Sequence, residues 1–162
     1  MKKRTKKYSG PKYVALNVMT TFFGGLSGDH AEHLQTLLLK NHGAMAAIVQ
    51  GHGDRDAWDR LVGAINMANV LCEQGIGDEF RAATIAGRDA LMEVGKRSMK
   101  SGKFGFTGDE LKAMNAALAC HDAQLENIRA IDIDRAADEV QRRIRHGINS
   151  TSVRAEMEKE AA

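Results

Sequence analysis

The sequence predicts an all-α protein: a four-helix up-down bundle with a long C-terminal helix and a basic, flexible N-terminal arm. Apolar residues recur at helical spacing between residues 29 and 147. The single proline, Pro11, lies outside every predicted helix. Aromatic residues make up only 5% of the chain, so the core must consist mainly of aliphatic side chains and alanine. Such a core suits the packing of helix on helix.

The first predicted helix begins near Ser27 or Asp29, both good N-cap residues, and ends near Gln50. After a glycine-containing turn, Asp54 is expected to cap a second helix that ends at Gly75. The apolar stripe of the first helix comprises Leu34, Leu37, Leu38, Met45, Ile48 and Val49. That of the second comprises Trp58, Leu61, Val62, Ile65, Ala68 and Cys72.

The third predicted helix opens at Gly77-Asp78 and ends in a basic turn at residues 100–103. Several glycines fall inside the predicted helices, where each costs about 1 kcal/mol relative to alanine. Because alanines lie nearby, we expect these glycines to let helix backbones approach closely. They are Gly43, Gly63, Gly87 and Gly95.

The longest predicted helix covers residues 107–147, as one helix or as two stacked end to end. Thr107 and Glu110 have the spacing of a capping box. Cationic residues crowd the last turn, where they offset the helix dipole, and Gly147 can supply a left-handed stop. The apolar spacing is interrupted between residues 129 and 134, which leaves the continuity of the helix open.

The chain therefore divides into four segments: a basic flexible arm (1–13), an extended or short helical segment with a glycine-rich loop (14–28), a helical bundle domain (29–147) and a loose charged tail (148–162). The apolar residues of 14–23 fit both strand alternation and helical spacing. As a strand, this segment would pair with its copy in a second subunit, because a lone strand is unstable.

Charge is distributed unevenly along the chain. Residues 1–13 hold six cations and no acid, whereas the remainder holds 17 basic and 21 acidic residues, a balance of −4. Lysine and arginine neutralise phosphates, and tyrosine stacks on bases, so the arm predicts contact with nucleic acid. The alternative is a solvated tail that aids solubility. The predicted nucleic-acid-binding residues are Lys2, Lys3, Arg4, Lys6, Lys7, Tyr8, Lys12 and Tyr13.

A second candidate site consists of polar residues on apolar helical faces. Buried amides and imidazoles are costly unless hydrogen-bonded, so these groups are expected to meet across the bundle. A functional interpretation makes His121 an acid or base, oriented by Asp122 or Asn115. The favoured interpretation is a satisfied polar layer that fixes helix register. The set comprises Asn41, His42, Asn66, Asn115, His121, Asp122 and Gln124.

No catalytic residue, cofactor or metal is predicted. Carboxylate-bridged di-iron bundles carry paired Glu-x-x-His motifs, which this sequence lacks. His30 and His33, with Asp29 and Glu32 alongside, would supply only half of a metal site. The sequence also contains no phosphate-binding Gly-x-x-x-x-Gly-Lys-[Ser/Thr] loop and no Gly-x-Ser-x-Gly nucleophile elbow.

Cys72 and Cys120 form neither a Cys-x-x-Cys pair nor a disulfide framework, and reduced core thiols are predicted. The basic start followed by residues 14–23 superficially resembles a signal peptide, but polar residues interrupt it and no small-residue cleavage site follows. No apolar run approaches the ~18–20 residues that span a bilayer. These observations favour a cytoplasmic protein without a membrane partner.

Four segments carry a resemblance to known sequences: Asn41-His42-Gly43-Ala44, Asn66-Met67-Ala68, residues 102–111 and His121-Asp122-Ala123-Gln124-Leu125. In that order they resemble a group of short uncharacterised proteins carried by temperate phages and prophages of proteobacteria. The resemblance covers residues 13–147. It implies a phage-encoded protein in a bacterial cytoplasm, and it brings no activity, cofactor or catalytic residue with it.

These patterns favour a non-enzymatic regulatory or host-interaction protein of phage type. Its partner would be nucleic acid or a nucleic-acid-associated host protein complex, with inhibition of that complex as one mode of action. One alternative is a metal-binding or enzymatic bundle centred on His121, Asp122 and Asn115. Another is a homo-oligomeric structural component of an assembly.

Overall fold

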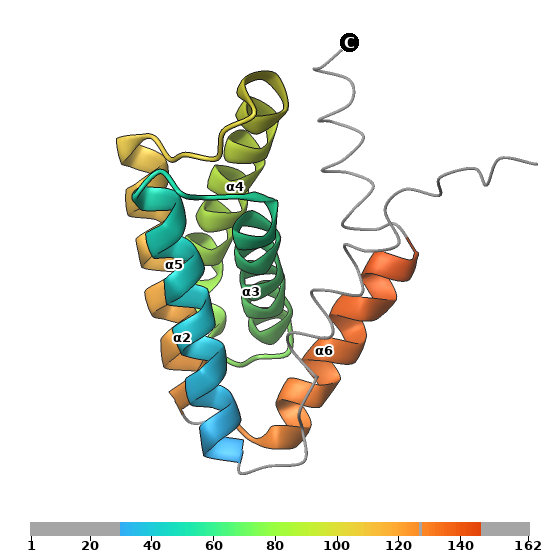
Figure 1. Ribbon diagram of the computed structural model, residues 1–162. Coiled ribbons are helices and arrows are strands. Elements are labelled where there is room, and N and C mark those ends of the chain that lie inside the picture. Colours follow the sequence, from blue (N-terminus) through green and yellow to red (C-terminus); the bar gives the residue numbers. More distant parts are fainter. Residues whose placement is uncertain (1–29, 127, 147–162) are drawn as a thin grey trace, which may run out of the picture.

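A computed structural model of the chain describes residues 30–126 and 128–146, and within these ranges every regular element is helical. The prediction of an all-α protein is therefore confirmed for this part of the chain (Figure 1). The predicted arm, the segment 14–28 and the tail 148–162 lie outside the described residues. The elements are α2 (His30–Val49), α3 (Arg55–Glu73), the 3-10 turn η1 (Asp78–Phe80), α4 (Arg81–Ser101), α5 (Gly108–Glu126) and α6 (Ala130–Arg145).

Helix α3 occupies the centre of the fold and packs against α2, α4, α5 and α6, while α4 and α5 form the most extensive helix pair (Figure 1). A first core cluster joins the second half of α2 to α3, α4 and the first half of α5; it includes Met45, Ile48, Trp58, Leu61, Ile65, Leu91, Val94, Met114 and Leu118. A second cluster joins the end of α3 to the end of α5 and to α6; it comprises Met67, Val70, Leu71, Leu125, Ile128, Ala136, Ala137 and Val140.

The helix starts follow local capping chemistry. The carboxylate of Asp54 accepts from the backbone N–H of Ala57 at 2.8 Å, which confirms the predicted cap of α3. Ahead of α5, the Glu110 carboxylate accepts from the Thr107 N–H at 2.8 Å, and the Thr107 hydroxyl accepts from the Glu110 N–H at 3.4 Å. The predicted capping box is thereby confirmed.

A single long helix over 107–147 is wrong, because α5 ends at Glu126 and a separate helix, α6, begins at Ala130. Arg129 has an extended backbone, with φ −81° and ψ 147°, and its guanidinium binds the Asp132 carboxylate at 2.6 and 2.9 Å. An unbroken helix would have continued along the α5 axis, with each later residue about 1.5 Å further along that axis. The break instead lays the apolar side of α6 against α3.

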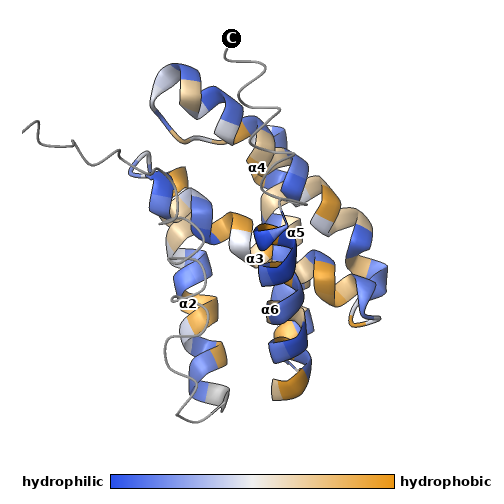
Figure 2. Cartoon of the chain, turned by 90° about the vertical axis from the view of Figure 1, so that its right-hand side faces the viewer, coloured by the Kyte–Doolittle hydropathy of each residue, from blue (hydrophilic) through white to orange (hydrophobic). Residues whose placement is uncertain are grey.

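The described residues therefore contain five α-helices, one more than the predicted bundle. Figure 2 shows the strongly amphipathic α6 with mainly hydrophilic residues on the side that faces the viewer. Its opposite side supplies Ala136, Ala137 and Val140 to the second core cluster.

Two of the helical glycines behave differently. A Cβ placed on Gly87 would lie 2.4 Å from the Cβ of Ala117, as the predicted close packing requires. A Cβ on Gly43 would meet no heavy atom within 4 Å, so the prediction of close packing is wrong there. The reason is that Gly43 lies on the solvent side of α2, between the buried residues Asn41 and Ala44.

Candidate functional site

The polar residues singled out from the sequence bring α2 and α5 together at one level. His42 Nε2 lies 2.7 Å from Asp122 Oδ2, and this ion pair sits at the surface with side-chain exposures of 53% for His42 and 29% for Asp122. The preceding residues, Asn41 on α2 and His121 on α5, are both fully buried. Each helix therefore turns one polar group outward and one inward at this level.

Gln124 determines the tautomer of His121. The Gln124 Nε2 donates to the backbone oxygens of Ile76, at 2.8 Å, and Ala68, at 3.2 Å. Its Oε1 consequently faces His121 Nδ1, at 3.2 Å. Because a carbonyl oxygen only accepts, Nδ1 carries the hydrogen and Nε2 presents a lone pair.

Burial lowers the pKa of His121, against the opposing effects of the Gln124 hydrogen bond and the Asp122 charge. The imidazole is therefore neutral at neutral pH. Because its exposed fraction is 0%, a substrate in solution has no access to it. This geometry suits a structural imidazole better than a general acid or base, which must reach the proton that it transfers.

A polar network continues from Gln124 toward α4. Its Nε2 also lies 3.2 Å from Cys72 Sγ, and the Cys72 thiol donates to the Gly77 backbone oxygen at 3.0 Å. Nearby, the fully buried Thr84 donates its hydroxyl to Asn69 Oδ1 at 2.9 Å. Burial raises the pKa of Cys72, so its sulfur remains a thiol at neutral pH and is a poor nucleophile.

Two members of the predicted set lie apart from this network. Asn66 is half-buried on α3, and Asn115 is exposed on α5. Neither hydrogen-bonds to His121 or Asp122 within the described residues, and the residue that orients His121 is Gln124.

Three members of this polar network were not predicted as such from the sequence: Cys72, Thr84 and Asn69. Thr84 on α4 and Asn69 on α3 are flanked in the sequence by many apolar residues, so they do not stand out as a polar pair. Several of the network's partners are backbone oxygens, which no side-chain pattern reveals. The signal that was available is the spacing of three between His121 and Gln124, which places both on one helical face.

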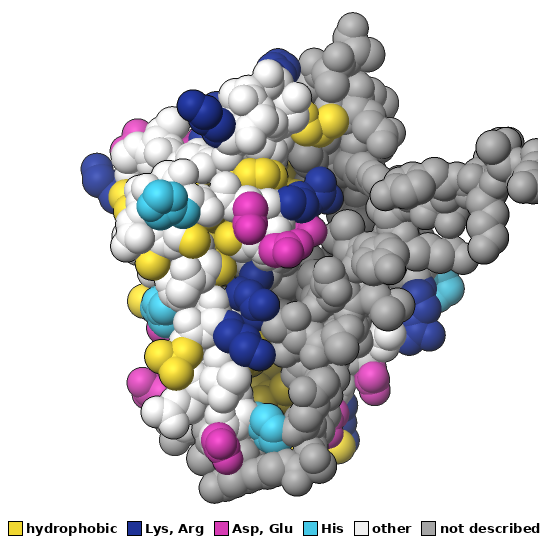
Figure 3. Space-filling view, in the orientation of Figure 1, with side chains coloured by type: hydrophobic (Ala, Val, Ile, Leu, Met, Phe, Trp, Pro, Cys, Tyr) yellow, Lys and Arg dark blue, Asp and Glu magenta, His cyan; other side chains and the backbone are white. Residues whose placement is uncertain are grey.

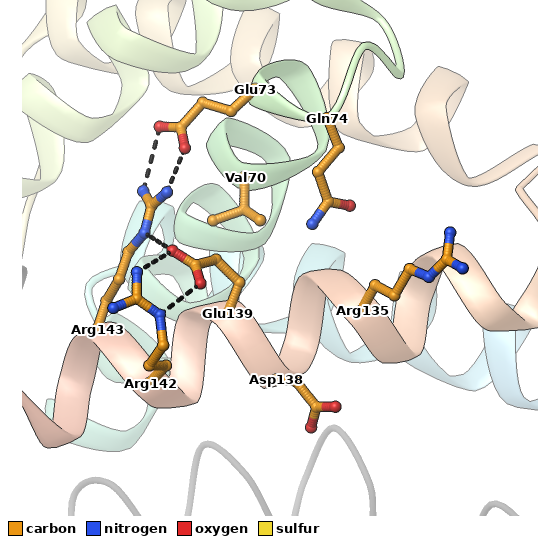
Figure 4. A pocket seen from close by; sticks show the side chains of 8 residues that line it. All are labelled: Val70, Glu73, Gln74, Arg135, Asp138, Glu139, Arg142 and Arg143. Atoms are coloured by element: carbon orange, nitrogen blue, oxygen red, sulfur yellow. Dashed lines mark hydrogen bonds and ion pairs between the residues drawn. The ribbon is translucent and has the colours of Figure 1, made fainter.

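A surface depression of about 540 Å³ lies between the end of α3 and α6 (Figure 4). Arg143 spans it, binding Glu73 of α3 and also Glu139 one turn earlier on α6. Arg142 also binds Glu139, through two bonds of 2.7 Å. The remaining lining residues are Val70, Gln74, Arg135 and Asp138.

The charges in this depression are largely compensated. The hydrogen bonds from Arg142 and Arg143 lower the pKa of Glu139 to about 2, so it stays ionised over the physiological range. The hydrogen bonds that Arg143 donates to Glu73 and Glu139 correspondingly raise the pKa of Arg143. The two arginines are thus already paired with carboxylates, which reduces their attraction for an external anion.

Within residues 30–126 and 128–146 no three His, Cys, Asp or Glu side chains converge as a metal site would require. Of the predicted half-site, His30 begins α2, and His33 is half-buried one turn later. Asp29 lies outside the described residues.

The surface carries side chains of both signs and scattered apolar residues (Figure 3). The large hydrophobic side chains exposed among the described residues are Leu39, Val49, Ile85, Met99 and Ile131. None of the described helices combines the length and the apolar composition needed to cross a bilayer.

The predicted arm residues, from Lys2 to Tyr13, lie outside the described residues. Comparison of the chain with protein-family models, with curated proteins and with solved structures found no match.

Proposed function

We propose that this chain is a non-enzymatic interaction protein of the phage regulatory type, whose basic residues 1–13 bind nucleic acid or a nucleic-acid-associated protein complex of a bacterial host. The observation that carries the proposal is the separation of charge along the chain. Six cations stand within residues 1–13 without any acid. A cluster of this kind neutralises phosphates and releases their counterions.

The arginines of the helical part have carboxylate partners close by, in contrast to the acid-free sequence of the arm. Most of these arginines are engaged with carboxylates, as in the pairs Arg55–Asp59 and Arg97–Glu110. Arg142 and Arg143, a second candidate basic patch, bind Glu139 and Glu73. A phosphate would have to compete with these carboxylates, whereas the sequence of the arm offers no acid as a local competitor.

The polar network supports a non-enzymatic role. Its imidazole is buried and neutral, its cysteine is held as a thiol, and its hydrogen bonds run mainly to backbone oxygens. These properties match a layer that fixes the register of α3 and α5. They do not favour the alternative of an enzymatic or metal-binding bundle centred on His121.

The test is a fluorescence-anisotropy titration of labelled single-stranded DNA, duplex DNA and RNA against the full chain, at about 50 and 200 mM salt. Neutralising six phosphates should weaken binding by roughly three orders of magnitude over this range. Changing Lys2, Lys3, Arg4, Lys6, Lys7 and Lys12 to Gln should abolish the interaction. Absence of binding by the unmodified chain at the lower salt concentration would refute direct nucleic-acid binding.

A control variant tests whether binding depends on the cations of the arm or only on the net positive charge of the chain. Lys40, Lys100, Lys103 and Lys112 all lie on the helical part and are exposed. Changing these four lysines to Gln lowers the net charge by four, against six for the arm variant, and should leave the salt dependence of binding nearly unchanged. Changing Tyr8 and Tyr13 to Ala should weaken binding to single strands more than binding to duplexes, since only unpaired bases offer their faces for stacking.

A homo-oligomeric assembly component is the second candidate, and the exposed apolar residues of α2 favour it. Leu39 and Val49 are 69% and 53% exposed on the solvent side of this helix. Light scattering should then give a mass that is a multiple of 17.7 kDa. A strictly monomeric mass up to high protein concentration would exclude this candidate while leaving nucleic-acid binding by the arm intact.

A further inference from the structure

Buried polar atoms without a hydrogen-bond partner gather where α2 meets α5. Within the described part of the chain the unpartnered atoms on these two helices are both side-chain polar atoms of Asn41, Nε2 of His121 and Oδ1 of Asp122, and one further such atom, Nη1 of Arg60, belongs to α3. Asn41 and His121 are fully buried. A buried amide or imidazole nitrogen left unpaired costs about 1–3 kcal/mol, so several at one place call for a physical explanation.

The helix register places these atoms at a common level. Helices α2 and α5 run in opposite directions (Figure 1), and His42 binds Asp122 directly at 2.7 Å. One turn further along α2, Met45 belongs to the same core cluster as Leu118, which lies one turn earlier on α5. Because the helices are antiparallel and each rises about 1.5 Å per residue, a step back from His42 to Asn41 matches a step forward from Asp122, so Asn41 and His121 lie within about 3 Å of the same level.

The hydrogen-bonding inventory at this level lacks donors. His121 Nε2 presents a lone pair, because Nδ1 carries the ring hydrogen toward Gln124. Asp122 Oδ1 and Asn41 Oδ1 are acceptors as well, so among the unpartnered atoms of α2 and α5 in the described ranges the one donor is the Asn41 amide nitrogen. Its two hydrogens can serve His121 and Asp122 at most, so the Asn41 oxygen still needs a donor from elsewhere.

We propose that Asn41, His121 and Asp122 form an internal binding site for water between α2 and α5. A water molecule supplies the missing donors and typically makes about three hydrogen bonds in a buried site. The apolar neighbours Met45 and Leu118 on one side and Leu125 on the other provide no competing polar group. The bound water thereby adds a polar link between two helices that, among the residues the structure describes, are joined by the His42–Asp122 contact.

The ion pair also provides the route for exchange with solvent. Asp122 has one oxygen bonded to the exposed His42 and the other buried without a partner. The carboxylate therefore bridges the surface and the site. Water in the site is expected to be ordered and to exchange slowly, because it must pass this pair.

The test is nuclear magnetic resonance of the full, ¹⁵N-labelled chain in water. Long-lived water should give cross-peaks to the side-chain amide protons of Asn41, assigned through their loss in Asn41→Leu. In oxygen-17 relaxation dispersion, Asn41→Leu should lose the contribution of at least one slowly exchanging water. Asn115→Leu, which removes an exposed amide from α5, should retain that contribution in full.

Two results would overturn the proposal. The first is an absence of water contacts together with a coupling across a hydrogen bond from the Asn41 amide nitrogen to His121 Nε2, which would show direct closure of the layer. The second is a one-to-one shift of the His121 ring resonances on addition of Zn²⁺, which would assign the site to a metal. The unmodified chain alone decides both, even if Asn41→Leu folds poorly.

Discussion

Gly87 of α4 and Ala117 of α5 face each other so closely that a Cβ added to Gly87 would lie 2.4 Å from the Ala117 Cβ. Both positions are buried, and each side of the contact is fixed to a helix backbone. Neither side can therefore relax by turning a side chain. This contact determines how near α4 and α5 approach, in the most extensive helix pair of the fold.

Gly87→Ala should consequently destabilise the protein. The alanine gains about 1 kcal/mol of helix propensity, but the steric overlap costs about 2–3 kcal/mol because neither backbone-fixed side can give way, so we expect a net loss of about 1–2 kcal/mol in the free energy of unfolding. Urea unfolding measures the difference. Gly43→Ala is the matched control and should stabilise the protein by about 1 kcal/mol, because its Cβ enters open space. Equal stabilisation by both changes would contradict the close contact.

Glu110 should make stability depend on pH. The hydrogen bond from Arg97 is the main cause that lowers the pKa of Glu110, and the Thr107 bonds add to it, while burial opposes them. The folded state thus favours the ionised carboxylate, so this stabilisation is complete above about pH 4.3, the usual pKa of glutamate, and is lost as the pH falls through the lower folded value. Glu110→Gln should cost about 1 kcal/mol at pH 7 and flatten the acid limb of the stability curve.

The partner variant tests this assignment of cause. Arg97 donates to both oxygens of Glu110, at 2.6 and 2.5 Å. Arg97→Gln should therefore remove much of the same pH dependence, and the double variant should lose less than the sum of the two single variants. Strict additivity would show that the two side chains act independently.

Gln124→Leu should destabilise the protein and release the His121 ring. It removes the donor to the Ile76 oxygen and the acceptor for Nδ1, and unpaired buried groups cost about 1–3 kcal/mol. Long-range ¹H–¹⁵N spectra of the imidazole report the tautomer directly. Gln74→Leu, at an exposed position after α3, is the control and should leave both tautomer and stability nearly unchanged. An unaltered tautomer in Gln124→Leu would show that another group orients the ring.

Glu139 should titrate at a low pH. Its hydrogen bonds from Arg142 and Arg143 lower its pKa to about 2, so the carboxylate stays ionised as the pH falls from 7 to about 3. Carbon-13 chemical shifts of the carboxyl group measure this titration. The depressed pKa means that the contribution to stability is present above the ordinary glutamate pKa and disappears toward pH 2. Arg142→Gln should raise the pKa of Glu139, and a value unaffected by that change would contradict the pairing.

The helix caps were the part of the fold that could be predicted best from the sequence. The caps at Asp54 and Thr107 depend on side chains within three residues of the backbone groups that they bind. The interrupted spacing at residues 129–134 left one helix or two open, and the direction that α6 takes after Ala130 was not predicted, because it depends on the surface that α3 offers to the later apolar residues. Gly43 was assigned to a packed face for a similar reason, since helical spacing does not identify which side of α2 lacks a neighbour.

The sequence predicted most of the buried polar residues of the candidate site, but it did not predict which groups they hydrogen-bond to. Asn41, His121 and Gln124 stand out as polar residues at apolar helical positions, and all three are buried. Asn115 lies beside the same stripe but points to solvent. The main partners of Gln124 are backbone oxygens more than 45 residues away, and such contacts leave no trace in a side-chain pattern.

The break between α5 and α6 has a consequence for cooperativity. Helix α6 packs chiefly on α3, and its polar links across that contact centre on Arg143. It can therefore separate from α3 while the Gly87–Ala117 contact remains intact. Amide hydrogens in α6 should exchange through this local opening, with a smaller free energy than those of α3, α4 and α5, so that the chain opens in two successive stages.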